Sequence, residues 1–529
     1  MTFVISLCLV GEGAVKKIKL KINHKNKIHT IETFKGKFLK DVSEAEGIPF
    51  SFPCGGNGRC GKCMVRFISG APRPTAADMT YIREKELSEG YRLLCRCVLE
   101  NDCEVSINDS ADEDGIVAES VDINSFDKNV KERDFDSYGI AVDIGTTTIA
   151  AALLGVNKSG EHAVIDTAST VNHQRKYGDD VISRIAYASD EEGLKRLNEI
   201  VVSDVKELVD KLSAGIKSEI AGLVVTGNTT MLHIFRNINV ESLGRYPYET
   251  TGLDIEKRSM YGINTVIMPG FTAFVGADIL SGVYFTDLMK EGEKSLLLDL
   301  GTNGEMAYYN GKELKICSTA AGPVFEGGTI SCGVASVPGA ISHIRINEAG
   351  HKVSYETIGG KAPIGLCGTG VMEAVSELVR VGVISSDGLL SDEYFDEGFP
   401  ITEDKKVSLK QEDIRNVQLA KAAVNSGIRQ LLSGEVPDRV CISGGFGTNI
   451  DYDAIRPLKL FPDTVEGNCV GAGNTALKGA LKYLAASLSG DDRVSEETAL
   501  LTKIKESATE LILANKDDFD DTFVEAMNF

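Results

Sequence analysis

The chain of 529 residues is too long for one hydrophobic core and predicts about three or four domains. A formal net charge of −21 and an isoelectric point near 4.9 argue against binding a polyanion such as nucleic acid. No stretch approaches the roughly 18 apolar residues of a membrane span, so we expect no membrane insertion. Twelve cysteines in a chain without a recognisable signal peptide favour a reducing compartment, and we expect the cytoplasm.

The first part of the chain, which we expect to be a domain of residues 1–108, opens with strands. Residues 16–34 alternate Ile and Leu with Lys, and the apolar pattern resumes after a turn expected around Asn23–Asn26. This predicts two strands. A short helix is expected from Leu39 to Glu46, just before a cysteine-rich loop. Later apolar runs predict further strands at 64–68 and 103–107.

Three cysteines in the loop lie within ten residues of one another and are separated by four glycines. The run reads Pro53-Cys-Gly-Gly-Asn-Gly-Arg-Cys-Gly-Lys-Cys63. An iron–sulfur cluster fits this pattern, because its sulfides accept hydrogen bonds from backbone N–H groups and glycine lets the loop wrap tightly with positive φ. A disulfide pair is the alternative, but a glycine-dense triplet is a poor disulfide framework. We therefore predict Cys54, Cys60 and Cys63 as iron ligands.

A fourth thiolate is expected from Cys95 in Arg92-Leu-Leu-Cys95, with Cys97 as the alternative. Two strands, a helix, a cysteine loop and later strands resemble the β-grasp 2Fe-2S ferredoxins. Five residues separate Cys54 from Cys60, where the plant-type loop has four, and this spacing is similar to that of the adrenodoxin-like branch. Arg-Leu-Leu-Cys resembles the ferredoxin sequence Arg-Leu-Ala-Cys, so the resemblance implies Cys95 as the fourth ligand.

Residues 109–137 have the composition of a linker. Ten Asp or Glu stand against three Lys or Arg, and the apolar residues are isolated. Because so little apolar surface is available for a core, we interpret the segment as an acidic tether between domains. A fixed arm packed on the neighbouring domain is the alternative.

Two similar strand–turn–strand segments follow the linker. The first runs from Tyr138 through Asp143-Ile-Gly-Thr-Thr-Thr148, and the second runs from Ser295 through Asp299-Leu-Gly-Thr-Asn-Gly304. Each apolar strand ends in Asp and turns through Gly-Thr, which indicates an internal duplication. A phosphate chain explains the pattern, because glycine lets backbone N–H groups approach phosphate oxygens, threonine hydroxyls donate hydrogen bonds and aspartate can hold Mg²⁺. The expected phosphate-binding residues are Gly145, Thr146, Thr147, Gly301, Thr302, Asn303 and Gly304.

A third segment completes the expected nucleotide site. The strand Arg439–Ser443 runs into Gly444 and Gly445, where a base and ribose could lie against bare backbone. Together the three segments resemble the phosphate and adenosine motifs of the superfamily of acetate and sugar kinases, heat-shock chaperones and actin. The resemblance implies an actin-like fold of two RNase-H-like α/β halves that close on ATP. We expect these halves at 138–290 and 291–485, and a C-terminal helical segment at 486–529.

Several further stretches are more particular. They are Asn172–Arg184, Thr226–His233, Pro269–Asp278, Ala321–Gly328 and Gly365–Gly370. Combined with the ferredoxin-like domain, they resemble the reductive activators of corrinoid-dependent methyl-transfer systems, from about Lys16 to Phe529. The expected fold is therefore α/β and multidomain: a β-grasp 2Fe-2S ferredoxin, an acidic linker and a duplicated ATPase.

The resemblance implies an ATP-dependent activator of a corrinoid protein. One electron from the 2Fe-2S cluster would return inactive Co(II) to Co(I), and a low-potential electron donor would re-reduce the cluster. Asp143 and Asp299 would manage Mg²⁺ and the attacking water, and Glu326, beside two glycines, is a candidate third catalytic residue. Gly444 and Gly445 would accommodate adenosine.

Three other functions stay open from the sequence. The chain could activate a different low-potential metalloenzyme, act as an ATP-switched module that senses redox state, or be a small-molecule kinase with an accessory ferredoxin. The kinase is disfavoured because no substrate-recognition motif is visible. The oligomeric state is also open, with a homodimer as one form that the sequence allows.

The cluster assignment predicts the effect of changing a single thiol. Cys60→Ser should abolish the paramagnetic signal of the reduced cluster and leave ATP binding intact, because the two motifs lie in separate domains. Electron paramagnetic resonance and a nucleotide-binding titration measure the two effects. Wild-type protein that holds no iron after anaerobic purification would contradict the assignment.

Overall fold

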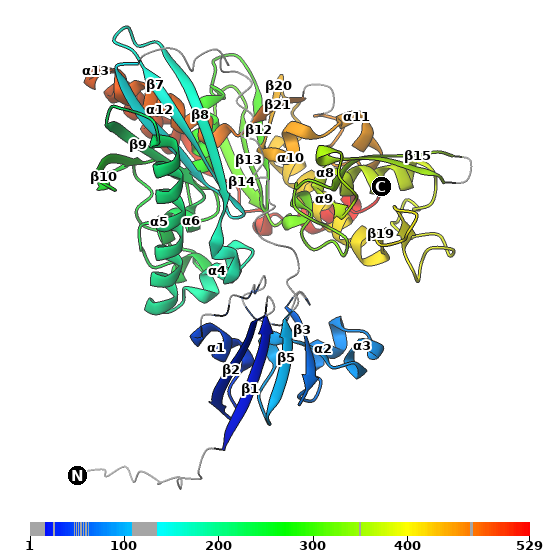
Figure 1. Cartoon of the computed structure of the whole chain (residues 1–529). Coiled ribbons are helices and arrows are strands. Elements are labelled where there is room, and N and C mark those ends of the chain that lie inside the picture. Colours follow the sequence, from blue (N-terminus) through cyan, green and yellow to red (C-terminus); the bar gives the residue numbers. More distant parts are fainter. Residues whose placement is uncertain are drawn as a thin grey trace, which may run out of the picture. The chain divides into compact units, whose positions relative to one another are not determined.

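The computed structural model describes most of the chain in two compact units (Figure 1). The first unit comprises Met1–Glu113 with Arg175–Asp179, and the second comprises Asp114–Gln174 with Asp180–Phe529. The described residues are 16–24, 27–46, 48, 50, 52, 56, 58, 61, 63–107, 135–348, 351–465 and 469–529. Cys54, Cys60 and residues 109–134 of the expected linker lie outside them. No helix in the described ranges is long and apolar enough to cross a membrane.

The first unit contains the expected ferredoxin-like sheet. Its strand order is β2-β1-β5-β3-β4, with α1 (Leu39–Ala45) where the helix was predicted. The strands are β1 (Lys17–His24), β2 (Lys27–Phe34), β3 (Met64–Ser69), β4 (Tyr91–Leu93) and β5 (Cys103–Ile107). Ile18, Leu20 and Ile22 alternate into the core, as their spacing predicts. The turn expected at Asn23–Asn26 is wrong in its first half, because Asn23 and His24 still pair with β2.

The second unit opens with a six-stranded mixed sheet of order β10-β11-β9-β6-β7-β8. The first predicted hairpin forms its antiparallel centre, and two parallel strands follow on the other side of β6. The strands are β6 (Ser137–Ile144), β7 (Thr148–Val156), β8 (His162–Val171), β9 (Ile220–Gly227), β10 (Glu256–Met260) and β11 (Ile263–Ile267). The helices of this half are α4 (Val181–Tyr187), α5 (Glu191–Ser213), α6 (Thr229–Phe235) and α7 (Ala277–Phe285).

The second sheet repeats the order of five of these strands, in keeping with the duplication, and differs in one edge strand. It reads β21-β20-β12-β13-β14-β22, so the meander β12-β13-β14 corresponds to β6-β7-β8. Its strands are β12 (Ser295–Leu300), β13 (Gly304–Tyr309), β14 (Leu314–Thr319), β20 (Arg439–Ser443), β21 (Cys469–Gly473) and β22 (Ala508–Glu510). The helices that follow in this half of the chain are α9 (Gln411–Leu432), α10 (Gly444–Asn449), α12 (Thr475–Ser489), α13 (Asp491–Ser507) and α14 (Phe519–Ala526). The C-terminal segment 486–529, which was expected to be helical, thus also contains the strand β22, which pairs with β14.

Contacts at three glycines join the duplicated halves. Helix α12 follows the second sheet in sequence but packs on the first (Figure 1). There Leu484 lies against Gly139 of β6. Helices α12 and α7 also contact one another closely, and a Cβ on Gly479 would overlap the backbone carbonyl of Ser281. A Cβ on Gly282 would likewise press on the Thr475 hydroxyl. Side chains would push the helices apart, so glycine fixes this crossing.

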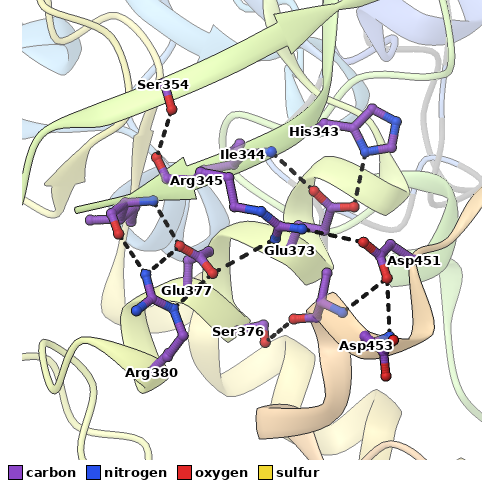
Figure 2. Close-up of polar contacts among 12 residues, drawn as sticks. His343, Ile344, Arg345, Ser354, Glu373, Ser376, Glu377, Arg380, Asp451 and Asp453 are labelled. Atoms are coloured by element: carbon purple, nitrogen blue, oxygen red, sulfur yellow. Dashed lines mark hydrogen bonds and ion pairs between the residues drawn. The ribbon is translucent and has the colours of Figure 1, made fainter. Parts of the chain in front are cut away.

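An insertion between β14 and β20 carries helix α8 (Gly368–Arg380) and a small sheet of β15 (Ala340–Ile346), β16 (Val353–Thr357) and β17 (Gly365–Leu366). Figure 2 shows how α8 covers one edge of β15. Glu373 accepts the Ile344 N–H (3.0 Å), and Glu377 accepts the Ile346 N–H (2.7 Å). Two glutamates four residues apart on the helix thereby accept hydrogen bonds from the backbone N–H groups of alternate strand residues. The edge of β15 is therefore not free to pair with another strand there.

Arg380 provides the counter-charge for this arrangement. Its Nη2 lies 2.8 Å from Glu377 and also donates to the Ile346 carbonyl oxygen (Figure 2). Although burial acts to raise it, these bonds from Arg380 and Ile346 hold the pKa of Glu377 below its ordinary value. Helix α8 is therefore anchored at its C-terminal end.

The N-terminal end of α8 packs against the 3₁₀ turn Pro323–Glu326. A Cβ on Gly368 would overlap the Phe325 carbonyl and approach the Glu326 nitrogen. The anchored helix thus sets the position of the turn that carries Glu326, one of the predicted site residues.

Candidate functional site

Two of the four predicted cluster ligands lie side by side in the first unit. Cys63 immediately precedes β3, and Cys95 lies just after β4, the strand that pairs with β3. The Leu94 N–H donates to the Cys63 carbonyl (2.8 Å), which brings the two buried thiols to an Sγ–Sγ distance of 3.2 Å. This distance exceeds that of a disulfide and places two ligands for one small metal group.

The alternative ligand Cys97 has a different environment. Its thiol donates to the Leu93 carbonyl oxygen at 3.3 Å, whereas the thiols of Cys63 and Cys95, which belong to the same core, face one another. Gly56, Gly58 and Gly61 of the loop have φ of 77°, 69° and 68°, so the expected positive φ is confirmed at these three positions. Residues other than glycine adopt this backbone conformation only with strain. The conformation suits a loop that wraps around a cluster. The geometry favours Cys95 over Cys97.

The two aspartate hairpins are formed as predicted. Asp143 and Asp299 each stand one residue before the end of the central strand of a sheet. Gly145 N–H donates to the Thr148 carbonyl (3.0 Å) and Gly301 N–H to the Asn303 carbonyl (3.3 Å), which closes each turn. A Cβ on Gly301 would have as its nearest neighbours an oxygen of Asp299 at 3.8 Å and one of Glu326 at 3.9 Å. Space for a ligand atom therefore exists between these carboxylates.

Glu326 joins the two hairpins. Its Oε2 accepts a hydrogen bond from the Thr147 hydroxyl (2.6 Å), and its Oε1 accepts one from the Thr302 hydroxyl (3.1 Å). The three residues come from different parts of the second unit, yet one carboxylate spans the turns of both halves. The two hydroxyls here bind an anionic group, as they would if they bound phosphate oxygens.

Hydrogen bonds from the second half hold both aspartates. The Ser443 hydroxyl donates to Asp299 (3.0 Å) and receives a bond from the Thr475 hydroxyl (2.8 Å). The side-chain amide of Asn474 donates to Asp143 (2.8 Å). Sequence reasoning missed Asn474. The available signal was the tripeptide Gly-Asn-Thr, which occurs after a strand at both 227–229 and 473–475.

Four carboxylates form a cluster in which each repels others. They are Asp143, Asp278, Asp299 and Glu305. Removal from water is the main cause that raises the pKa of each, and it brings the pKa of Asp143 to about 7. Repulsion between neighbours adds to the rise, while Asn474 and Ser443 oppose it at Asp143 and Asp299. Asp278 and Glu305 were not predicted as site residues.

The predicted adenosine segment ends beside the same cluster. Strand β20 pairs in parallel with β12, so Ser443 lies opposite Asp299. Gly444 begins α10 with φ of 87°, and a Cβ there would lie 3.3 Å from an Asp299 oxygen. The structure thus brings the three sequence-predicted segments to one end of the central strands. Such an arrangement can bind a magnesium–nucleotide complex, because turn N–H groups and hydroxyls suit phosphates and carboxylates suit the cation.

Comparison with known proteins gives matches along nearly the whole chain. Residues 22–100 match a family model for a 2Fe-2S iron–sulfur cluster binding domain. Residues 138–291 match the model of the RACo middle region, and residues 293–529 match that of the C-terminal domain of RACo, the ASKHA domain. The two RACo models together cover well over half of the chain.

Individual proteins agree with these models. The corrinoid activation enzyme RamQ of Eubacterium limosum is 27% identical, over 93% of this chain and 96% of its own. A reductase of the Co(II) methylated amine-specific corrinoid protein from Methanosarcina barkeri is 25% identical, over 73% of this chain and 76% of its own. The solved structure of a reductive activator for corrinoid, iron–sulfur protein is 28% identical and covers 97% of this chain and 98% of its own, with a TM-score of 0.65.

The raised pKa of Asp143 predicts a pH dependence of stability without nucleotide or divalent cation. A carboxyl whose folded pKa lies near 7 and whose ordinary value is 3.8 stabilises the fold when protonated, and this contribution is lost as the pH rises toward and through 7. Asp143→Asn cannot ionise. Its melting temperature minus that of the wild type, measured in EDTA, should therefore increase by a few degrees from pH 5 to pH 8. An offset independent of pH would show that Asp143 is already ionised in the empty site.

Proposed function

The chain is a RACo-like corrinoid activator, with an N-terminal 2Fe-2S domain, a RACo middle region and a RACo C-terminal ASKHA domain, and we propose that it drives single-electron delivery from its cluster with ATP. Its reaction is the reductive activation of corrinoid proteins, in which Co(II) becomes Co(I). When bound, the 2Fe-2S cluster would supply the one electron that reduces Co(II), and a low-potential donor would replace that electron.

The observation that carries the proposal is the presence of both functional parts in one chain. The first unit brings Cys63 and Cys95 to 3.2 Å, and the second unit brings two aspartate hairpins to one site. We assign Cys54, Cys60, Cys63 and Cys95 as the cluster ligands. The bound cluster supplies one-electron chemistry, and the cysteine loop supplies its thiolates and backbone N–H donors.

In the second unit we assign Asp143 and Asp299 to Mg²⁺, directly or through water. Thr147 and Thr302 donate to phosphate oxygens, and Gly444 and Gly445 face adenosine. Glu326 already accepts from both threonine hydroxyls, so a terminal phosphate competes with it for the same donors. Once displaced, its carboxylate stands beside the terminal phosphate and can orient the attacking water.

ATP can drive the electron transfer only through a difference in binding. Each 59 mV of unfavourable potential costs a factor of ten in the one-electron equilibrium. The nucleotide must therefore bind more tightly to the conformation that delivers the electron than to the one that does not. We place the reaction in the reducing cytoplasm, in keeping with the thiol chemistry.

An anaerobic reduction assay tests the proposal. Purified protein is mixed with a Co(II) corrinoid protein, a low-potential reductant and magnesium ATP, and the Co(I) absorption band is followed. The band should rise with ATP and stay low without it or with Cys60→Ser. Equal rates with and without ATP would contradict the coupling, and full activity of Cys60→Ser would contradict the electron route.

A second prediction concerns Asp299. Asp299→Asn keeps the size of the side chain and removes its charge, so ATP turnover should fall on the order of 100-fold, as expected when a preorganised charge is removed from a catalytic site. Iron content should stay at the wild-type level, because the cluster lies in the other unit. Phosphate release and iron analysis give the two measurements. Unchanged turnover would mean that the ATP site lies elsewhere.

A further inference from the structure

Two copies of one tripeptide converge on the first aspartate hairpin. Gly227-Asn228-Thr229 joins β9 to α6, and Gly473-Asn474-Thr475 joins β21 to α12. In both copies the asparagine is the residue before the helix, and its Oδ1 accepts a backbone N–H of the first turn. The distance from Asn228 Oδ1 to Met231 N is 2.9 Å, and that from Asn474 Oδ1 to Leu477 N is 2.7 Å.

Capping leaves the other end of each amide pointing at the hairpin. Asn474 Nδ2 donates to Oδ2 of Asp143 at 2.8 Å, and Asn228 Nδ2 donates to Oγ1 of Thr146 at 3.1 Å. The planar amide carries its acceptor and its donor on the same carbon, so the helix cap fixes the direction of the donor. Asparagine is the side chain of this length that does both.

Helix α12 is itself held in place at this point. Thr475 donates a hydrogen bond to Ser443, which donates to Asp299. Asn474 and Thr475, at the start of the helix, therefore reach the aspartates of both halves, Asn474 directly and Thr475 through Ser443. The contacts at Gly282 and Gly479 leave no room for α12 to shift toward α7. The donor on Asn474 is therefore anchored to a rigid element and not to a mobile loop.

We infer that Asn474 and Asn228 are positioning residues for nucleotide turnover, Asn474 by orienting the carboxylate of Asp143 and Asn228 by orienting the hydroxyl of Thr146. The inference rests on the proposed function of this hairpin in binding magnesium nucleotide. A bond to Oδ2 sets the plane of the Asp143 carboxylate and engages one of its two oxygens. A bond accepted by Thr146 Oγ1 leaves its O–H to donate to a phosphate oxygen.

The competing explanation is that the two asparagines act only as helix caps. Substitution by serine separates the two explanations. Serine caps a helix about as effectively as asparagine, but its side chain is too short to cap the helix and contact the hairpin at the same time. Asn474→Ser and Asn228→Ser should therefore melt within a few degrees of the wild type. A role in capping alone predicts wild-type kinetics for both variants.

A positioning role predicts a different and divided effect. Asn474→Ser should lower kcat for ATP hydrolysis about 10- to 100-fold, the usual loss when a partner of a catalytic or metal-binding group is removed. Asn228→Ser should mainly raise KM and should weaken the binding of magnesium ATP measured by titration. Asp190→Ser is the matched control, because Asp190 is an exposed cap that holds Gly193 at the start of α5. It should leave kcat, KM and binding at wild-type values.

A double-mutant cycle tests whether Asn474 acts through Asp143. If it does, Asn474→Ser combined with Asp143→Asn should be no slower than Asp143→Asn alone. A wild-type kcat in a folded Asn474→Ser variant would overturn the inference, as would losses of kcat that multiply in the double variant. In either case a slow Asp143→Asn variant would still support the proposed site. Wild-type turnover by Asp143→Asn itself would overturn both the proposed role of the aspartate and the inference built on it.

Discussion

Carboxylates from both halves of the duplicated fold are held against one another at the ends of the two central strands. Asp143, Asp278, Asp299 and Glu305 repel one another, and their removal from water raises the pKa of each. Such a cluster is stable either with bound protons or with a bound cation. In the function proposed above, a magnesium nucleotide would supply the cation and occupy both Gly-Thr turns at once. The empty and loaded sites therefore differ in charge as well as in contacts.

The rest of the second unit keeps these charges in place. Helix α12 lies on the first sheet and contacts α7 through glycine, so the two halves share a rigid junction next to the cluster. Helix α8 is anchored at its C-terminal end by Arg380 and Glu377 (Figure 2). Its N-terminal end packs against the turn of Glu326. Glu326 in turn receives hydrogen bonds from both hairpins. Direct contacts therefore connect the two Gly-Thr turns, through Glu326, to α8 and its small sheet.

Local patterns made much of this fold predictable. Each hairpin is a short stretch whose apolar run, aspartate and glycine turn are adjacent in sequence, and the order of the motifs then indicates the duplicated sheets. Asn474, Asp278 and Glu305 escaped prediction because their roles depend on which segments meet. Asn474 is 331 positions from Asp143, and a capping asparagine in Gly-Asn-Thr looks the same whether or not its amide has a partner. The pairing of Cys63 with Cys95 was predictable only through a resemblance, since spacing alone left Cys97 open.

The charge of the site bears on how ATP can serve an electron transfer. On the proposed assignment, the acidic cluster repels free nucleotide, so tight binding would require magnesium and the complete set of turn donors. A conformation that withdraws one hairpin, or lets Glu326 retain its two threonine hydroxyls, loses several of these contacts together. A hundredfold difference in nucleotide affinity between two such conformations is equivalent to about 120 mV for a one-electron step, from the factor of ten per 59 mV. A few hydrogen bonds at Thr147, Thr302 and Asp143 are enough to supply a difference of that size, because bonds to charged groups each contribute about 1.5–3 kcal/mol and a factor of ten corresponds to about 1.4 kcal/mol.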